Sequence, residues 1–227
     1  MVNNMKIIVC GDSYLSADTK YPGTHFTELL AKDHEYVNLA RVGCSNSLIR
    51  LQVARALQLQ PDLIIVSATD HRRFEVIEQT YDPAHGLENF DYNPSWWGRN
   101  ASLQWVKQTH VTGICEFVSV LKSQLGSKSK KQAWTSWVTH LMDEDWETEK
   151  TGWVIESMLA TLIFSKVNFL YMPNGNLIPD WLDSKDVYTE ILTELDCESD
   201  TTYHTTPDIQ RELFNRVQEH LVRLNYV

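Results

Sequence analysis

Three short, mostly apolar runs in the first 70 residues limit the folds open to this chain. Lys6–Cys10 reads KIIVC, residues 36–39 read YVNL and residues 62–67 read DLIIVS. The runs are too short for helices and rich in β-branched residues, which favours strands. The first and third lack polar alternation, as is typical of strands in a parallel sheet covered on both faces. We therefore predict three buried strands.

Segments with helical periodicity separate these strands. Residues 24–32 (THFTELLAK) predict a helix with Thr24 as its N-cap, and residues 48–59 predict a second helix that Pro61 terminates. Strands that alternate with helices at this spacing indicate a doubly wound α/β fold with a central parallel sheet.

The second half of the chain adds a fourth strand and a well-marked last helix. Residues 167–172 (VNFLYM) predict the strand. Thr206 as N-cap, Pro207 at the first helical position and Asp208 in the first turn mark the start of the helix. Its apolar stripe consists of Ile209, Leu213, Val217, Leu221 and Leu224.

The middle of the chain interrupts the α/β pattern. Residues 71–105 are polar, aromatic and rich in turn residues, so we predict a long excursion after the third strand, followed by helices near 111–125, 131–142 and 145–165. At 227 residues, the length fits one domain covering 1–227, with 71–165 as an insertion and helices within it.

Composition excludes several classes of function. A net charge of -10 argues against a nucleic acid or an anionic membrane as the main partner, since both need a basic face. No stretch approaches the roughly 20 apolar residues that span a bilayer, and no signal peptide is recognisable, so we expect a soluble, cytoplasmic protein. Metal-ligand spacings and nucleotide-binding motifs are missing, so no metal and no cofactor are expected.

The carboxyl ends of the predicted strands carry polar loops that converge at one edge of the sheet, where ligands of such folds collect. Gly11-Asp12-Ser13 follows the first strand, residues 43–47 follow the second and residues 68–70 follow the third. His204 lies just before the last helix, which can bring it to the same edge.

These parts suit acyl transfer. A serine hydroxyl needs a base, and His204 is the best placed of the eight histidines to activate Ser13. The oxyanion needs donors, for which the backbone N–H groups of Ser13 and Gly43 and the hydroxyl of Thr69 are candidates. Asp200 is the nearest upstream carboxylate that could orient His204.

The order and spacing of four segments resemble the blocks of the SGNH hydrolase (GDSL-type esterase) superfamily. They are Gly11-Asp12-Ser13, NLARVGCSN at 38–46, PDLIIVSATD at 61–70 and His204 before the terminal helix. The resemblance covers roughly residues 5–75 and 167–225, and the insertion-rich form is similar to phage-encoded members. It implies a flavodoxin-like three-layer α/β/α sandwich, Ser13 as nucleophile, His204 as base, and Gly43 and the third-block residue as oxyanion donors.

Two positions depart from the pattern of that superfamily. Thr69 stands where the third block has asparagine, and Thr201 stands where an aspartate precedes the histidine by three residues, with Asp200 one step further back. Either Asp200 reaches His204 or a Ser–His dyad works with a backbone carbonyl.

Other loop residues are expected to line the substrate site. These are Asp12, Asn46, Asp70 and the pair Trp96 and Trp97, which could instead form a small core beneath a long loop. The polar, tryptophan-bearing insertion favours an O-acetylated carbohydrate or another small ester as substrate.

Two further hypotheses stay open at the sequence level. Gly-Asp-Ser is a common turn, so an inactive binding or structural protein with this fold is one alternative. A thiol enzyme that uses Cys10 or Cys44 is another, although the four cysteines show no pairing pattern and are expected to be free thiols. A homo-oligomer is left open.

Overall fold

The structure is a computed structural model of the 227-residue chain. It describes residues 4–16, 21–41, 45–69, 74–77, 106–109, 143–173, 178–183 and 206–226, together with residues 129, 132, 133, 136 and 140.

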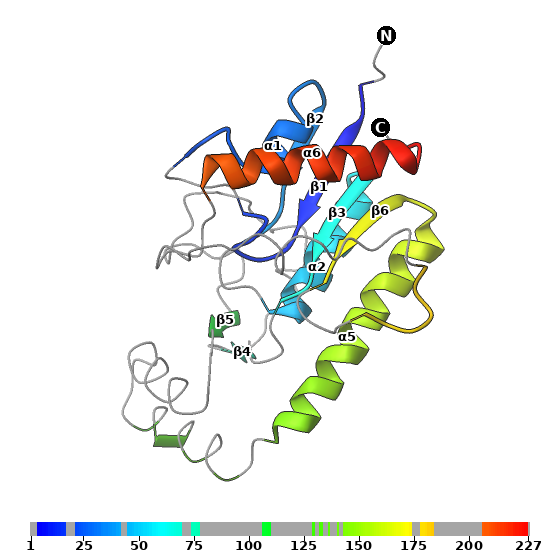
Figure 1. Ribbon diagram of the computed structural model, residues 1–227. Coiled ribbons are helices and arrows are strands. Elements are labelled where there is room, and N and C mark those ends of the chain that lie inside the picture. The colour runs from blue at the N-terminus through cyan, green and yellow to red at the C-terminus, as the bar shows by residue number, and fades with distance from the viewer. Residues whose placement is uncertain are drawn as a thin grey trace.

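A four-stranded parallel sheet forms the centre of the protein (Figure 1). Its strands are β1 (Lys6–Cys10), β2 (Glu35–Asn38), β3 (Leu63–Ser67) and β6 (Asn168–Met172), in the order β2-β1-β3-β6. The registers are in phase along the sheet, with Ile8 opposite both Val37 and Ile64. All four predicted strands are confirmed to within a residue at each end. Every residue of β3 is buried, as its unbroken apolar pattern predicts.

Helices cover both faces of this sheet, which confirms the α/β class and its three layers. Helices α2 (Asn46–Gln58) and α5 (Glu144–Ser165) pack on one face, whereas α1 (Phe26–Leu30) and α6 (Pro207–Arg223) pack on the other (Figure 1). Alternate strand residues point to the two faces, so Ile8 and Ile64 enter the core beneath α2 and α5. Ile7 and Ile65 enter the core beneath α1 and α6.

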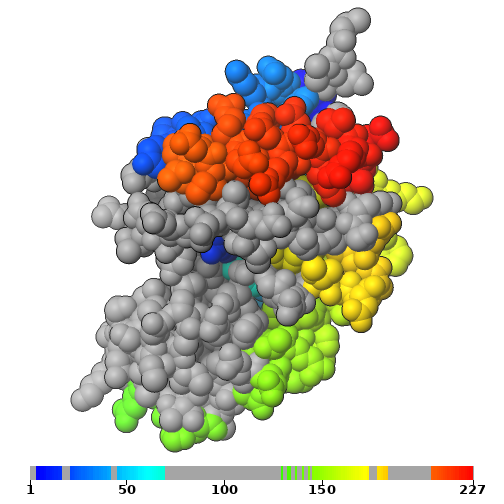
Figure 2. Space-filling view, viewed as in Figure 1, coloured from blue at the N-terminus to red at the C-terminus, as the bar shows by residue number. Residues whose placement is uncertain are grey.

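The last helix follows its sequence signals closely. Thr206 is the N-cap and its hydroxyl accepts a hydrogen bond from Ile209 N, while Pro207 occupies the first turn. Leu213, Val217 and Leu221 are buried in the core that α6 shares with α1. Figure 2 shows α6, orange to red, lying beside α1, in blue.

The first two helices begin at residues that the sequence did not indicate. Helix α1 starts at Phe26 with His25 as its N-cap, so the prediction of Thr24 as N-cap is wrong. His25 is preferred because its side chain accepts from Thr27 N while Glu28 reaches back to His25 N, which completes a capping box. Helix α2 starts two residues before Leu48, since Ser45 Oγ accepts from Leu48 N at 3.3 Å.

The excursion after β3 contains a regular element that we did not predict. Strand β4 (Phe74–Ile77) pairs antiparallel with β5 (Val106–Thr109) in a separate two-stranded sheet. The predicted helix at 145–165 is confirmed by α5. The predicted helix at 111–125 and most of the one at 131–142 lie outside the described residues, and the boundaries of the insertion stay a prediction. Among the described helices, none combines the length and apolar character that a membrane crossing requires.

Candidate functional site

The strand order places a topological switch point between β1 and β3. Strand β2 lies on one side of β1 and β3 on the other, so the connections that leave the carboxyl ends of β1 and β3 diverge there. Ligands of open α/β sheets bind in the crevice at such a point. The loop 11–16 follows β1, and Ala68 and Thr69 follow β3. This topology selects the Ser13 loop independently of any motif.

Ser13 lies in a tight turn that Asp12 begins. The Asp12 carbonyl accepts hydrogen bonds from Leu15 N at 3.3 Å and from Ser16 N at 3.0 Å. Ser16 Oγ donates to the Ser13 carbonyl at 3.1 Å. Ser13 is 7% exposed, and within the described ranges its hydroxyl makes no hydrogen bond. The turn therefore holds the Ser13 backbone while the described structure leaves its hydroxyl uncommitted.

A hydrogen bond between Thr69 and Asp12 joins the two loops across the switch point. Thr69 Oγ1 donates to Asp12 Oδ2 at 2.7 Å, and both residues are fully buried. The other carboxylate oxygen of Asp12 accepts from Tyr14 N at 3.0 Å. A threonine hydroxyl has a single proton to donate. In the structure the Thr69 hydroxyl donates that proton to Asp12, whereas the sequence predicted that it would donate to the oxyanion.

Asn46 fastens the backbone of Thr69 to the start of α2. Its Nδ2 donates to the Thr69 carbonyl at 2.8 Å, and its Oδ1 accepts from Thr69 N at 2.8 Å. The side chain is buried, and these two hydrogen bonds hold the loop that follows β3. The predicted contact between Asn46 and substrate stays a prediction. Both hydrogen-bond donors of Thr69 are thus used within the protein.

A relay of hydrogen bonds holds the far end of the Ser13 loop. His25 Nε2 lies 2.9 Å from the Tyr14 carbonyl, which can only accept, so Nε2 carries the proton and Nδ1 accepts from the Thr27 hydroxyl at 2.7 Å. Tyr36 OH lies 2.8 Å from Thr27 Oγ1, and it accepts from Asn38 Nδ2 at 3.0 Å. Asn38 Nδ2 also donates to the Leu15 carbonyl at 2.9 Å.

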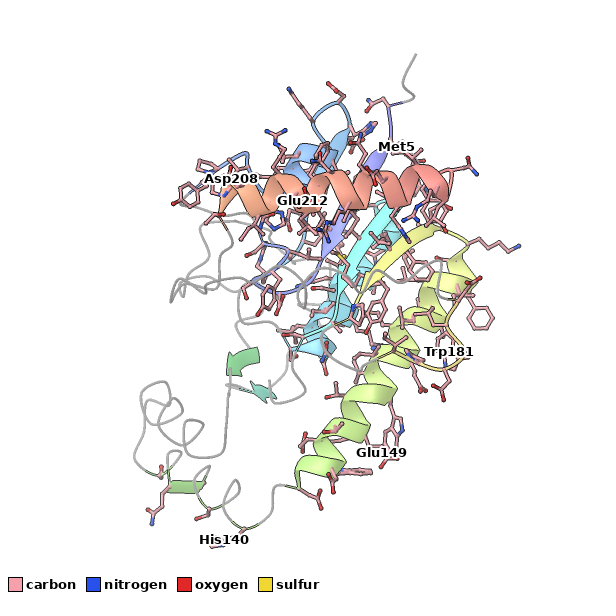
Figure 3. The ribbon with its side chains drawn as sticks, in the orientation of Figure 1. Met5, His140, Glu149, Trp181, Asp208 and Glu212 are labelled. Atoms are coloured by element: carbon pink, nitrogen blue, oxygen red, sulfur yellow. The ribbon has the colours of Figure 1, made fainter. Side chains whose placement is uncertain are left out.

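The amino-terminal end of α6 is tied to the same region. Gln210 Oε1 accepts from Phe26 N at 2.8 Å, although the two residues are 184 positions apart. Figure 3 places Asp208 at one end of α6 and Met5, just before β1, near the other. Helix α6 therefore begins on the side of the sheet where β1 ends.

Several of the predicted site residues fall outside the described residues. They are Gly43, Asp70, Trp96, Trp97, Asp200 and His204. Ser13, Asp12, Asn46 and Thr69 are described, and the structure brings all four together. Among the described residues, no cluster of histidine, cysteine, aspartate and glutamate could hold a metal ion.

Cys10 lies directly before the loop but is unsuited to nucleophilic chemistry. It is fully buried, and burial raises the pKa of its thiol far above the usual range. A reactive cysteine needs a depressed pKa and access to substrate. The described geometry thus disfavours Cys10 as a catalytic thiol, and Cys44 lies outside the described residues.

Two residues that hold the Ser13 loop, His25 and Gln52, were not predicted from the sequence. Gln52 is fully buried on α2 among apolar neighbours, and its carboxamide pairs with the backbone of Gly11. A signal for Gln52 was available, because a carboxamide within an apolar helical stripe needs buried partners. His25 carried no such signal, since its contact with the Tyr14 carbonyl depends on the path of the loop.

The fold and the loops define a doubly wound α/β protein with a serine-bearing turn at the switch point. No family model matches the chain, and no curated protein matches it significantly. The chain is similar to a solved structure from Desulfitobacterium hafniense DCB-2, a protein described as lipolytic and of the G-D-S-L family. That similarity has 14% identity and a TM-score of 0.36, and covers 96% of this chain and 100% of the other.

A second similar structure is that of TesA, with 13% identity and a TM-score of 0.40, covering 95% of this chain and 97% of the other. Both TM-scores are below 0.5, so these similarities assign neither an activity nor the role of a residue.

Proposed function

We propose that the protein is a serine esterase of SGNH type that hydrolyses a small ester, with O-acetylated carbohydrates as the favoured substrate class. The observation that carries the proposal is the 2.7 Å hydrogen bond between Thr69 and Asp12. It joins the loops of β1 and β3 across the switch point and so holds Ser13, the next residue, at the edge where ligands of this fold bind.

The proposed reaction has two balanced halves. Ser13 Oγ attacks the ester carbonyl carbon while His204 takes the hydroxyl proton, and the tetrahedral intermediate then collapses. The bond to the alcohol oxygen breaks, His204 returns the proton to the leaving alcohol, and an acyl-enzyme remains. Water, deprotonated by His204, attacks the acyl carbon. The carboxylic acid leaves and the proton returns to Ser13.

The described contacts change the proposed oxyanion hole. The backbone N–H groups of Ser13 and Gly43 remain the proposed donors, because Thr69 uses its hydroxyl on Asp12 and its N–H on Asn46. Thr69 then serves to hold Asp12, and through Asp12 the Ser13 turn. Removing one oxyanion donor costs about 3 kcal/mol of transition-state stabilisation, so a site with two donors would be a slower esterase than one with three.

The position of α6 supports His204 as the base. His204 precedes the Thr206 N-cap by two residues in the sequence. Gln210, in the first turn of α6, bonds Phe26 N at the start of α1, and His25, the N-cap of α1, bonds the Tyr14 carbonyl in the Ser13 loop. Helix α6 is therefore linked to the Ser13 loop through α1. In this proposal Asp200 or a backbone carbonyl orients the ring, and Asp70, Trp96 and Trp97 contact the substrate.

A fluorophosphonate probe tests the nucleophile directly. The wild-type protein is expected to gain one adduct on the tryptic peptide that contains Ser13, seen as a mass shift. Ser13→Ala should gain none and should lose hydrolysis of p-nitrophenyl acetate, whereas Ser165→Ala, an exposed serine on α5, should match the wild type. A folded wild-type protein that stays unlabelled would reject the proposal.

The pH dependence of the rate tests the base. Because His204 must be neutral to accept the Ser13 proton, kcat/KM should rise with a pKa between about 6 and 7. His204→Ala should abolish this rise together with most of the activity. A flat profile in the wild type would point to another base. A panel of acetylated sugars, assayed beside p-nitrophenyl esters, then tests the favoured substrate class.

A non-catalytic binding protein is the second candidate function. The commitment of both Thr69 donors favours it, because the position that resembles a third oxyanion donor is occupied by internal hydrogen bonds. Under this reading, acetylated sugars would bind in a calorimetric titration without turnover, and Ser13→Ala would bind them equally well.

A further inference from the structure

Gln52 is a fully buried carboxamide on the apolar face of α2. Its neighbours on that helix, Leu48, Ile49, Val53 and Ala56, all enter the core. Burying an amide without hydrogen bonds is costly, so the side chain must be satisfied inside the protein.

Both polar atoms of Gln52 pair with one backbone residue, Gly11. Gly11 N donates to Gln52 Oε1 at 2.6 Å, and Gln52 Nε2 donates to the Gly11 carbonyl at 3.1 Å. Gly11 is the first residue beyond β1, whose last paired residue is Cys10, opposite Val66. The carboxamide thus bonds the backbone just beyond the last residue that β1 pairs with β3, and the Gly11 carbonyl also accepts from Arg41 N at 3.0 Å.

We propose that Gln52 is a positioning residue for the esterase reaction, which clamps the Gly11 peptide and thereby fixes the Ser13 N–H toward the oxyanion. This inference rests on the proposed function. Gly11 and Ser13 are separated only by Asp12, whose carboxylate is held by Thr69 and whose carbonyl begins the turn. Gly11 is bonded to Gln52 at its N–H and its carbonyl, and Asp12 is bonded at its carboxylate and its carbonyl. The peptide that carries the Ser13 N–H therefore has little freedom to rotate.

Asn46 forms the matching clamp on the other loop. Its carboxamide pairs with the N–H and carbonyl of Thr69 in the same two-bond pattern, with both distances at 2.8 Å. Helix α2 therefore holds the backbone beyond β1 and the backbone beyond β3 through two carboxamides. Preorganised donors stabilise an oxyanion because they need no reorientation during the reaction.

Two substitutions separate the clamp from simple packing. Gln52→Met keeps the unbranched shape and removes both hydrogen bonds. Gln52→Glu keeps an acceptor for Gly11 N, but it can donate to the Gly11 carbonyl only when its carboxyl group is protonated. Val53→Ala is the matched control for stability, since it removes buried contacts from the same helix, and Gln58→Met is the exposed control.

Kinetics on p-nitrophenyl acetate give the first readout. Gln52→Met should lower kcat by about tenfold or more with KM within about threefold of wild type, because the loss falls on the transition state. We then divide kcat/KM of Gln52→Glu by kcat/KM of wild type at each pH, so that the titration of His204, present in both proteins, cancels. This ratio should rise as the pH falls from 8 to 5, because a protonated glutamic acid can again donate to the Gly11 carbonyl. A kcat equal to that of Val53→Ala, with a ratio that does not change with pH, would overturn the positioning role.

Amide hydrogen exchange gives a readout that does not depend on activity. In Gln52→Met, the Gly11 and Ser13 amides should exchange at least about tenfold faster than in Val53→Ala, while those of β3 keep their protection. Equal exchange in both variants would overturn the clamp. A wild-type protein that reacts with no fluorophosphonate would instead reject the proposed function, and the exchange data would still decide whether Gln52 holds the loop.

Discussion

The glycine of the Gly-Asp-Ser turn is required by space. A Cβ built on Gly11 would lie 2.3 Å from Ser67 Oγ, closer than Cβ atoms approach other atoms, and 3.1 Å from Leu15 Cδ1, a tight contact from which the leucine side chain would have to shift. Ser67 Oγ is itself buried and has no hydrogen-bond partner among the described residues. Strand β3 thus presents an unsatisfied hydroxyl to the one residue of the loop that has no side chain. An unsatisfied buried hydroxyl costs about 1–3 kcal/mol.

Substitutions at these two positions should be strongly coupled. Gly11→Ala should lower the free energy of unfolding by about 1–3 kcal/mol, because the new methyl group overpacks the site. Ser67→Ala should leave stability unchanged or raise it by about 1 kcal/mol, since it removes the orphan hydroxyl. In the double variant, much of the Gly11→Ala cost should disappear. Urea unfolding of the four proteins measures this cycle, and additive effects would show that Ser67 does not limit residue 11.

At the scale of elements, the short helix α1 is capped by the same residue, His25, that bonds the Ser13 loop. The helix has five residues, too few to be stable on its own. His25 caps it, and the opposite nitrogen of the ring bonds the Tyr14 carbonyl. The cap and the loop contact therefore depend on one side chain.

Replacing His25 should separate these two contributions. His25→Ala removes the cap and the Tyr14 contact, and should lower the free energy of unfolding by about 2 kcal/mol. His25→Asn keeps a good N-cap but is too short to reach the Tyr14 carbonyl, so it should recover about half of that loss while the Ser13 loop stays loosened. Urea unfolding measures the first effect, and the rate of fluorophosphonate labelling measures the second. Complete recovery of both by asparagine would contradict the assigned loop contact.

The elements that the sequence predicted well are those with local signals. The β-branched run of β3 and the Thr206-Pro207 start of α6 each act within a few residues, and both are confirmed. The cap of α1 was missed because Thr24, one residue earlier, is a more usual N-cap type, whereas the structure uses the ring of His25, which the Tyr14 carbonyl 11 residues away also bonds. The roles of Thr69 and Asn46 could not be read either, since each is decided by a hydrogen bond between loops 23 or more residues apart.

At the scale of the whole molecule, the sheet separates two cores, each of which holds buried groups that folding keeps protonated. Cys10 and Tyr171 lie in the core beneath α2 and α5, and burial raises the pKa of both far above their usual ranges. Tyr36 packs against the core beneath α1 and α6, where burial raises its pKa to about 12. The fold is therefore expected to lose stability in alkali through both faces of the sheet.

The loss of stability in alkali can be measured at one position, Tyr36. Between pH 10 and pH 12 the unfolded chain releases the phenolic proton of Tyr36 while the folded protein keeps it. The contribution of Tyr36 to the free energy of unfolding is therefore full below pH 10 and is lost as the pH rises to 12. A shift from 10 to about 12 corresponds to on the order of 3 kcal/mol. At pH 8, Tyr36→Phe should be less stable than wild type, because the hydroxyl no longer bonds Thr27 and Asn38. That deficit should shrink or reverse by pH 12, whereas the deficit of the non-titrating control Val37→Ala should stay constant. Urea midpoints at each pH measure both, and parallel curves for Tyr36→Phe and wild type would show that Tyr36 does not carry the linkage.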